Sequence, residues 1–125
     1  MSIIQGGAPK PVDWIGRAHQ ELRDFPRAAR NQAGVELRAV QNGLTPADWK
    51  PLEDVGPGAA EIRVRSFQGG TVQHRVIYVA KFPEAVYVLH AFEKKTQTTP
   101  QHHLQIAAKR YRQMVRLRAM RKENA

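Results

Sequence analysis

Residues 61–95 alternate between apolar and polar positions, and this pattern predicts three β-strands around which the rest of the chain is arranged. Val, Ile, Tyr and Phe recur with a period close to two, and breaks at 68–70 and 82–84 separate the runs. Successive side chains of a strand point to opposite faces, so the two turns decide which residues share a surface. We therefore expect two successive hairpins and a small antiparallel sheet.

The two hairpins predict one basic face and one apolar face. Folding about Gly69 sets Arg63 opposite Arg75, and folding near Pro83 sets Arg75 roughly opposite His90. The basic face would carry Arg63, Arg65, Arg75, His90 and Phe92. The apolar face would carry Ile62, Val64, Val76, Tyr78, Tyr87 and Leu89. A slip of one residue in either hairpin would change this assignment.

Apolar residues spaced three and four apart predict two helices before the sheet. One buried stripe runs from Ile15 to Phe25, and a second begins at Pro26 and continues to Asn42. Proline suits the first turn of a helix but not its interior, and Asn followed by Gly is typical of a helix end.

The connecting segments predict a further strand, a loop and a closing helix. Residues 10–15 can form a short edge strand, while 43–60, rich in Gly and Pro, read as a loop that Trp49 and Leu52 hold by packing. After the sheet, Thr99 followed by Pro100 is a typical helix start. The apolar stripe of this last helix comprises Leu104, Ala107, Ala108, Tyr111, Met114 and Val115. The elements together predict one α+β domain over residues 1–125.

Charge and composition narrow the class of partner. The chain has 20 Lys and Arg against 11 Asp and Glu, a net charge of +9, which favours a polyanionic partner or serves solubility alone. It has no cysteine, which excludes disulfides and thiolate metal sites and suits a reducing cytoplasm. No run approaches the roughly 18 apolar residues of a membrane span, so we expect a soluble, cytoplasmic protein.

The last helix concentrates positive charge. Its seven basic residues are Lys109, Arg110, Arg112, Arg116, Arg118, Arg121 and Lys122, with only Glu123 of opposite sign nearby. Such an excess favours contact with phosphates or with an acidic protein.

No metal or cofactor site is predicted. His102 and His103 are adjacent, so on a helix they face different ways, and His19, His74 and His90 lack a nearby carboxylate cluster in the sequence. There is also no serine elbow, phosphate-binding glycine loop or pair of carboxylates.

The remaining candidate chemistry is metal-free cleavage of RNA. It needs a base for the ribose 2′-hydroxyl, an acid for the departing 5′-oxygen and fixed positive charge at the phosphorane. His90 could act as acid or base, Arg63 and Arg75 could bind phosphate oxygens, and Phe92 could stack on a base. Arg75 is expected to project from the polar face of a central strand, so that its removal would leave the fold intact.

Two readings without catalysis stay open for the same residues. Glu61 and Glu93 could pair with the arginines to make an ordinary salt-bridged sheet face. The basic face could also bind nucleic acid without cutting it.

Several segments in order resemble one known family. They are Trp14–Ile15, Phe25–Pro26, Leu37, Gln41–Gly43, Leu52, Gly56, Glu61–Arg63, Arg75–Tyr78, Leu89–Pro100, Ala107 and Arg110. The most specific is the His-Ala-Phe-x-Lys-Lys run that begins at His90. Over roughly residues 10–114 the chain resembles the phage-derived Gp49-like, HigB-type toxins of the RelE superfamily.

This resemblance implies a RelE-like fold, with two N-terminal helices packed on a small antiparallel sheet and a C-terminal helix. It implies a toxin that cleaves messenger RNA on the ribosome without a cofactor, and a helix-turn-helix, HigA-like antitoxin as partner. The catalytic candidates are Arg63, Arg75, His90 and Lys94. The candidates for binding RNA are Arg65, Phe92 and Lys95, with Lys109, Arg112 and Arg116 of the basic helix.

The chain departs from the family pattern in two places. No tyrosine follows the sheet where some superfamily members use one as a base, and a basic tail, 115–125, extends past the matched region. A noncatalytic nucleic-acid-binding protein of the same fold and a phage structural component therefore remain as alternatives.

Overall fold

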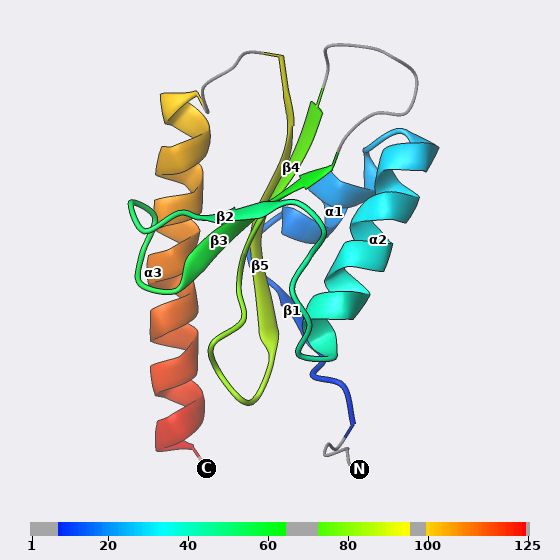
Figure 1. The fold of residues 1–125 in the computed structure, drawn as a ribbon. Coiled ribbons are helices and arrows are strands. Elements are labelled where there is room, and N and C mark those ends of the chain that lie inside the picture. Colours follow the sequence, from blue (N-terminus) through cyan, green and yellow to red (C-terminus); the bar gives the residue numbers. More distant parts are fainter. Residues whose placement is uncertain (1–7, 65–72, 96–99, 125) are drawn as a thin grey trace.

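The structure is a computed structural model that describes residues 8–64, 73–95 and 100–124. A central sheet lies between two helical layers, with α1 and α2 on one side and α3 on the other (Figure 1). In chain order the elements are β1 (Val12–Trp14), α1 (Ala18–Arg23), α2 (Arg27–Gln41), β2 (Trp49–Pro51), β3 (Ala59–Val64), β4 (Gln73–Val79), β5 (Val86–Lys94) and α3 (Gln101–Glu123). The predicted α+β class and the order of its helices are confirmed.

The sheet is mixed rather than purely antiparallel. Its strand order is β1-β5-β4-β3-β2, and β1 runs parallel to β5 while the other neighbours are antiparallel. The edge strand expected within 10–15 is confirmed, but its parallel pairing was not predicted. The loop expected over 43–60 contains the second edge strand, β2, whose three residues are too few to give a periodic signal.

The pairing of the central strands confirms the first hairpin and corrects the second. Arg63 lies opposite Arg75, as predicted, whereas Arg65 and the turn at Gly69 lie outside the described residues. Arg75 lies opposite Phe92 rather than His90. The connection between β4 and β5 is centred on Pro83, since Val79 pairs with Tyr87 and Tyr78 with Val88. The prediction was wrong because β5 contains one extra residue between these pairs and Arg75, which moves the partner of Arg75 along the chain to Phe92.

A β-bulge in the pairing of β4 with β5 changes the two predicted faces. Ile77 pairs with His90 and Tyr78 pairs with Val88, so Leu89 is an extra residue on β5. The extra residue inverts the alternation along the first half of the strand, so Tyr87 and Leu89 face α3 rather than sharing a face with Val76. The assignment of Tyr87 and Leu89 to the other apolar face was therefore wrong.

Both faces of the sheet are apolar where helices cover them. Under α1 and α2 the strands contribute Ala60, Ile62, Val64, Val76, Tyr78, Val86, Val88 and Ala91. Under α3 they contribute Ala59, Ile77, Val79, Tyr87, Leu89 and Phe92. The predicted basic face is thus limited to the part of the second face that carries Arg63 and Arg75.

The helices begin and end close to the predicted positions. Pro26 precedes α2, and Gly43 follows it with φ +82°, a left-handed conformation that favours glycine. Pro100 precedes α3, while Thr99 lies outside the described residues.

Trp49 is 41% exposed, so the packing role expected for it is wrong. Within the described ranges, no helix combines the length and apolar character that crossing a membrane requires.

The contact between Gly56 and α3 leads to a testable prediction. A Cβ placed at Gly56 would lie 2.5 Å from Cε2 of Tyr111, whose hydroxyl donates a hydrogen bond to the carbonyl of Pro57 at 2.7 Å. We expect Gly56→Ala to displace the tyrosine and lower the free energy of unfolding by about 1–3 kcal/mol, the usual cost of overpacking.

The matched control is Gly34→Ala in α2. A Cβ there meets no described atom within 4 Å, so better helix propensity should raise the free energy of unfolding by about 0.5–1 kcal/mol. Urea unfolding of both variants gives the comparison. Equal effects in the two variants would show that the contact with Tyr111 has no energetic weight.

Candidate functional site

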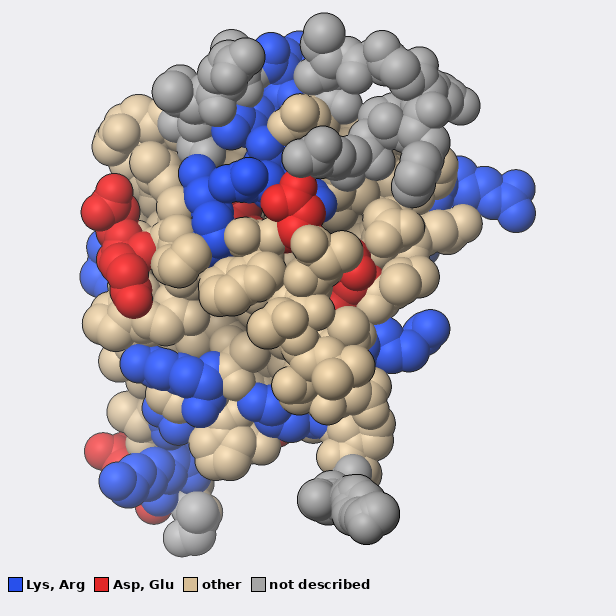
Figure 2. Space-filling model, viewed as in Figure 1, with Lys and Arg blue, Asp and Glu red and all other residues tan. Residues whose placement is uncertain are grey.

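A group of basic side chains surrounds one buried carboxylate on the α3-side face of the sheet. We call Lys50, Arg63, Arg75 and Lys94 the cationic cluster, with Glu61 at its centre. Figure 2 shows basic side chains gathered in the upper part of the view, with acidic side chains among them. The cluster is built from β2, β3, β4 and β5, and strand pairing places its members on one face.

Glu61 makes it possible for two arginines to lie opposite each other in the sheet. Directly opposed like charges destabilise a strand pair, and Arg63 and Arg75 occupy such positions. Glu61 is fully buried, with Oε1 2.7 Å from Nε of Arg75 and Oε2 3.9 Å from Nζ of Lys50. Among the described residues neither carboxylate oxygen accepts a well-aligned hydrogen bond, so charge attraction holds the pair together.

Arg75 is buried and occupied by internal partners. Besides its ion pair with Glu61, it donates to Oε1 of Gln73 at 2.5 Å and to the carbonyl of His74 at 3.4 Å. Burial lowers the pKa of Arg75, against the opposing charge of Glu61. Arg75 does lie on the polar face of a central strand, but it is buried there and paired with Glu61. Its removal would take away the closest cation of a buried carboxylate, so we no longer expect that change to leave the fold intact.

Lys94 is the buried member of the cluster whose ammonium has no close partner among the described residues, although the charge of Glu61 attracts it. It is 4% exposed, and its ammonium makes no hydrogen bond or ion pair with any described residue. Burial lowers the pKa of Lys94, and the positive charge of Arg75 lowers it further. A buried cation beside other cations is costly unless an anion joins it, so this position suits a phosphate.

The remaining members of the cluster reach towards solvent. The side chain of Arg63 is 34% exposed, with one terminal nitrogen 3.6 Å from Oδ1 of Asp48. Lys95 is exposed just after β5. The structure thus brings Arg63, Arg75 and Lys94 together.

His90 belongs to a different group, which we call the histidine network: Glu21, His90, His103 and Arg110. Nδ1 of His90 lies 2.9 Å from Oε1 of Glu21, and its Nε2 lies 2.8 Å from Nδ1 of His103. His90 is buried, and its two ring nitrogens are occupied by Glu21 and His103. The sequence showed no carboxylate cluster near His90, and the fold brings one carboxylate to it, that of Glu21 from α1, 69 positions away.

Arg110 completes the histidine network and joins three elements. Its guanidinium binds both oxygens of Glu21, at 2.7 and 2.9 Å, and donates to the carbonyl of Leu89 at 3.0 Å. Burial raises the pKa of Glu21, but hydrogen bonds from His90 and Arg110 more than offset this and lower it to about 2. These bonds fix α1, β5 and α3 relative to one another.

Phe92 is covered rather than open to a base. The ring of His103 stacks on it at 4.0 Å between centroids and 17° between planes, and His90 stacks at 5.1 Å. His102 lies against His103, again at 4.0 Å. Phe92 therefore supports the ring of His103.

The basic residues of α3 divide into two sets. Lys109, Arg112 and Arg116 are exposed, and their spacing of three and four places them along one side of the helix. Arg110, Arg118 and Arg121 instead bind carboxylates of other elements, which sequence neighbours could not reveal.

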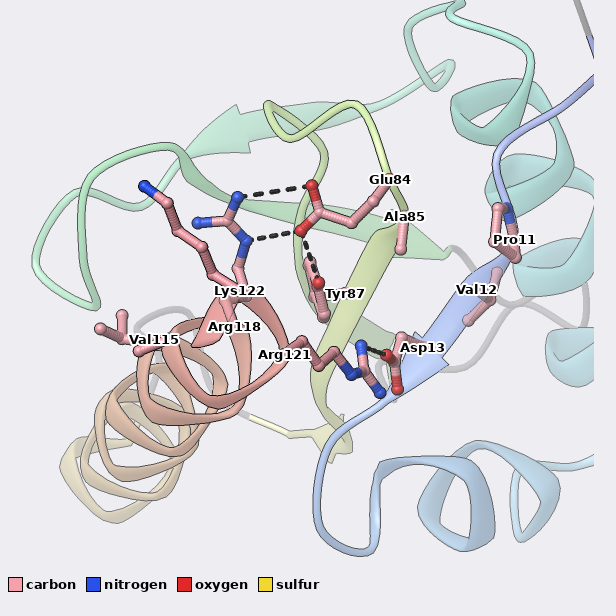
Figure 3. Close-up of a pocket in the computed structure, with 11 residues that line it drawn as sticks. Pro11, Val12, Asp13, Glu84, Ala85, Tyr87, Val115, Arg118, Arg121 and Lys122 are labelled. Atoms are coloured by element: carbon pink, nitrogen blue, oxygen red, sulfur yellow. Dashed lines mark hydrogen bonds and ion pairs between the residues drawn. The ribbon is translucent and has the colours of Figure 1, made fainter. Parts of the chain in front are cut away.

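A groove of about 710 Å³ lies between the end of α3, β1 and the start of β5 (Figure 3). Two ion pairs line it, Arg118 to Glu84 at 2.5 Å and Arg121 to Asp13 at 2.7 Å. Arg118 also lies over the ring of Phe82, 3.5 Å from its centroid. Because carboxylates already neutralise these two arginines, the groove has less positive charge available to bind an anion than the cationic cluster has.

The described residues contain no group of three or more His, Asp or Glu side chains arranged to hold a metal ion. Arg65, one of the predicted RNA contacts, lies outside the described part of the chain.

The buried pair predicts strong energetic coupling between Glu61 and Arg75. Arg75→Met should lower the free energy of unfolding by about 3–5 kcal/mol, because it leaves a buried carboxylate unpaired. The double variant Glu61→Leu/Arg75→Met should lose much less, since both charges are gone. Urea unfolding of the two single variants and the double variant measures the coupling, and strictly additive losses would contradict it.

The low pKa of Glu21 predicts an acid-labile contribution to stability. The folded-state pKa is about 2 against an ordinary value of 4.5, so the contribution is complete above pH 4.5 and is lost as the pH falls towards 2. Glu21→Gln should cost on the order of 3 kcal/mol near neutral pH and flatten the fall in stability over that range.

Urea unfolding between pH 2 and pH 7 tests this expectation. Glu123→Gln, at the exposed end of α3, is the control and should leave the curve unchanged. A Glu21→Gln curve parallel to the wild-type curve would show that Glu21 is not the titrating group.

Comparison with protein families matches residues 20–112 to the family described as Phage derived protein Gp49-like (DUF891). No curated protein sequence matches the chain significantly. The matched residues include every member of the cationic cluster and of the histidine network. This family includes toxins of toxin–antitoxin systems. The match spans most of the 125 residues, and the chain belongs to the phage-derived Gp49-like family.

Proposed function

We propose that the protein is the toxin of a type II toxin–antitoxin system and cleaves messenger RNA on the ribosome. The observation that supports this most directly is Lys94, a buried cation near Arg63 and Arg75 that makes no hydrogen bond or close ion pair with the described residues. Family membership supports the toxin class. In the proposed reaction the ribose 2′-hydroxyl attacks the adjacent phosphorus without a metal ion.

The cationic cluster supplies the charge that this reaction needs. Negative charge develops on the oxygens of the phosphorane. These oxygens would lie against Arg63 and Lys94, with Arg75 held behind them by Glu61. Fixed charges in a water-poor site act more strongly than the same charges in water. The lowered pKa of Lys94 also suits it to give a proton to the departing 5′-oxygen.

The ribosome is proposed to supply the geometry of the substrate. Arg75 and Lys94 are recessed in the sheet, so a flexible RNA has few side chains to hold it in line. Correct positioning can account for roughly 7–11 kcal/mol of a barrier. Lys109, Arg112 and Arg116, exposed along α3, are proposed to contact ribosomal RNA.

The proposed partners and location follow from this assignment. A helix-turn-helix, HigA-like antitoxin would neutralise the protein, and the messenger RNA and ribosome would be its targets in the cytoplasm. Arg65, Phe92 and Lys95 were candidates for RNA contact. Of these, Lys95 retains a proposed direct contact, and Phe92 acts through His103.

Arg63→Gln tests the proposed function with little risk to the fold. Its side chain is partly exposed and its ion pair with Asp48 is long, at 3.6 Å, so we expect stability close to wild type and ribosomal cleavage slowed about 10²–10³-fold. The control is Arg38→Gln, which removes the same charge from the exposed side of α2 and should cleave normally. Cleavage of a defined message in a purified translation mixture gives the rates.

The same assay separates the alternatives. Naked messenger RNA should stay largely uncut by the wild-type protein. Binding of RNA or ribosomes without any cleavage would favour a noncatalytic nucleic-acid-binding protein, and normal growth of a host expressing the protein without its antitoxin would argue against a toxin.

A further inference from the structure

The histidine network forms a chain of three groups that leads from the interior outwards. Glu21 lies 2.9 Å from Nδ1 of His90, and Nε2 of His90 lies 2.8 Å from Nδ1 of His103. The two nitrogens of an imidazole lie on opposite edges of the ring. Since Nδ1 of His103 points inwards to a buried residue, its Nε2 points away from that residue, and no described residue binds it.

The contacts also favour one arrangement of the protons. Both hydrogens of the first terminal nitrogen of Arg110 are used by Glu21 and by the carbonyl of Leu89, so its 3.2 Å approach to His90 leaves Nδ1 free to donate to the carboxylate. In the arrangement with its proton on Nδ1 and a lone pair on Nε2, His90 accepts from Nδ1–H of His103. Neutral His103 then carries its lone pair on the outward Nε2.

The sheet places His103 beside the cationic cluster. Its ring stacks on Phe92 at 4.0 Å, and Phe92 lies opposite Arg75. Lys94 is two residues further along β5 and therefore on the same face as Phe92. His103 and the cationic cluster thus lie on the same side of the sheet, with Phe92 as the residue that adjoins both.

We propose that His103 is the general base of the cleavage reaction and that Glu21 and His90 position it. This proposal rests on the proposed function. Nε2 of His103 takes the proton of the 2′-hydroxyl as the 2′-oxygen bonds to phosphorus. The bond from phosphorus to the 5′-oxygen breaks, and that oxygen receives a proton from the Lys94 ammonium. The products are a 2′,3′-cyclic phosphate and a 5′-hydroxyl, and proton exchange through water restores His103 and Lys94.

The surroundings of His103 keep it ready for this role. The titratable groups that act on it are Glu21 from α1, His90 from β5 and His102 from α3, while Arg110 of α3 contacts His90. Burial lowers the pKa of His103 to about 4, with further lowering by His90 and His102. The ring is therefore unprotonated at neutral pH, as a base must be.

His103→Asn is the variant that tests the proposal. An asparagine amide takes the place of Nδ1–H and can keep the hydrogen bond to His90, while the outward nitrogen is lost. We expect single-turnover cleavage on the ribosome to fall about 10²–10⁴-fold, with ribosome binding and melting temperature near wild type. His19→Asn, an exposed imidazole on α1, is the control and should cleave normally.

A substrate with sulfur in place of the scissile 5′-oxygen distinguishes the proposed base, His103, from the proposed acid, Lys94. Sulfur leaves without a proton, so this message should restore the rate of Lys94→Met but not that of His103→Asn. Rescue of His103→Asn would instead make His103 the acid and overturn the proposal.

Nitrogen-15 NMR of the imidazole rings tests the positioning roles without activity. At neutral pH the wild-type spectrum should show Nε2 of His103 unprotonated and Nδ1 of His90 protonated, and Glu21→Gln should mix these tautomers. A protonated Nε2 in the wild type would contradict the proposal.

The cleavage assay distinguishes failure of this proposal from failure of the proposed function. If the wild type and His103→Asn cleave equally well, the role of His103 is overturned and the proposed function stands. If the wild type never cleaves on ribosomes, both are refuted.

Discussion

The single extra residue on β5 is the constraint on which the rest of the structure depends. The bulge shifts the register of β5 where β4 passes from Ile77 to Tyr78, and this inverts the alternation along β5. Before the bulge Tyr87 faces α3, and after it Phe92 and Lys94 face the same side as Arg75. One strand therefore supplies apolar contacts to the closing helix at one end and a charged surface at the other.

The charges of the molecule divide into those that hold the fold and those that a ligand could reach. Arg110, Arg118 and Arg121 each bind a carboxylate of a distant element, so much of the basic character of α3 serves to attach it. Lys94 has no such partner among the described residues, although its burial is far greater. A high net charge alone does not distinguish these two uses.

Local patterns in the sequence predicted local structure well. The apolar stripes of α1 and α2, the end of α2 at Gly43 and the pairing of Arg63 with Arg75 all depend on neighbouring residues or on a single turn. The parallel pairing of β1, the bulge and the contact of Glu21 with His90 depend on residues far apart in the chain. Periodicity carries no information on such contacts, so the sequence could suggest His90 as a chemical group but not its partners.

The span of the histidine network has a consequence for the protein while it is being made. Glu21 meets His90 across 69 positions and Arg110 across 89, and β1 must wait for β5 before it can pair. Contacts of such long range form late, because the loop must close before they contribute. A chain still emerging from the ribosome that synthesises it therefore lacks the assembled network until α3 has been released. Release of α3 from the ribosome is thus the step that completes the histidine network during synthesis.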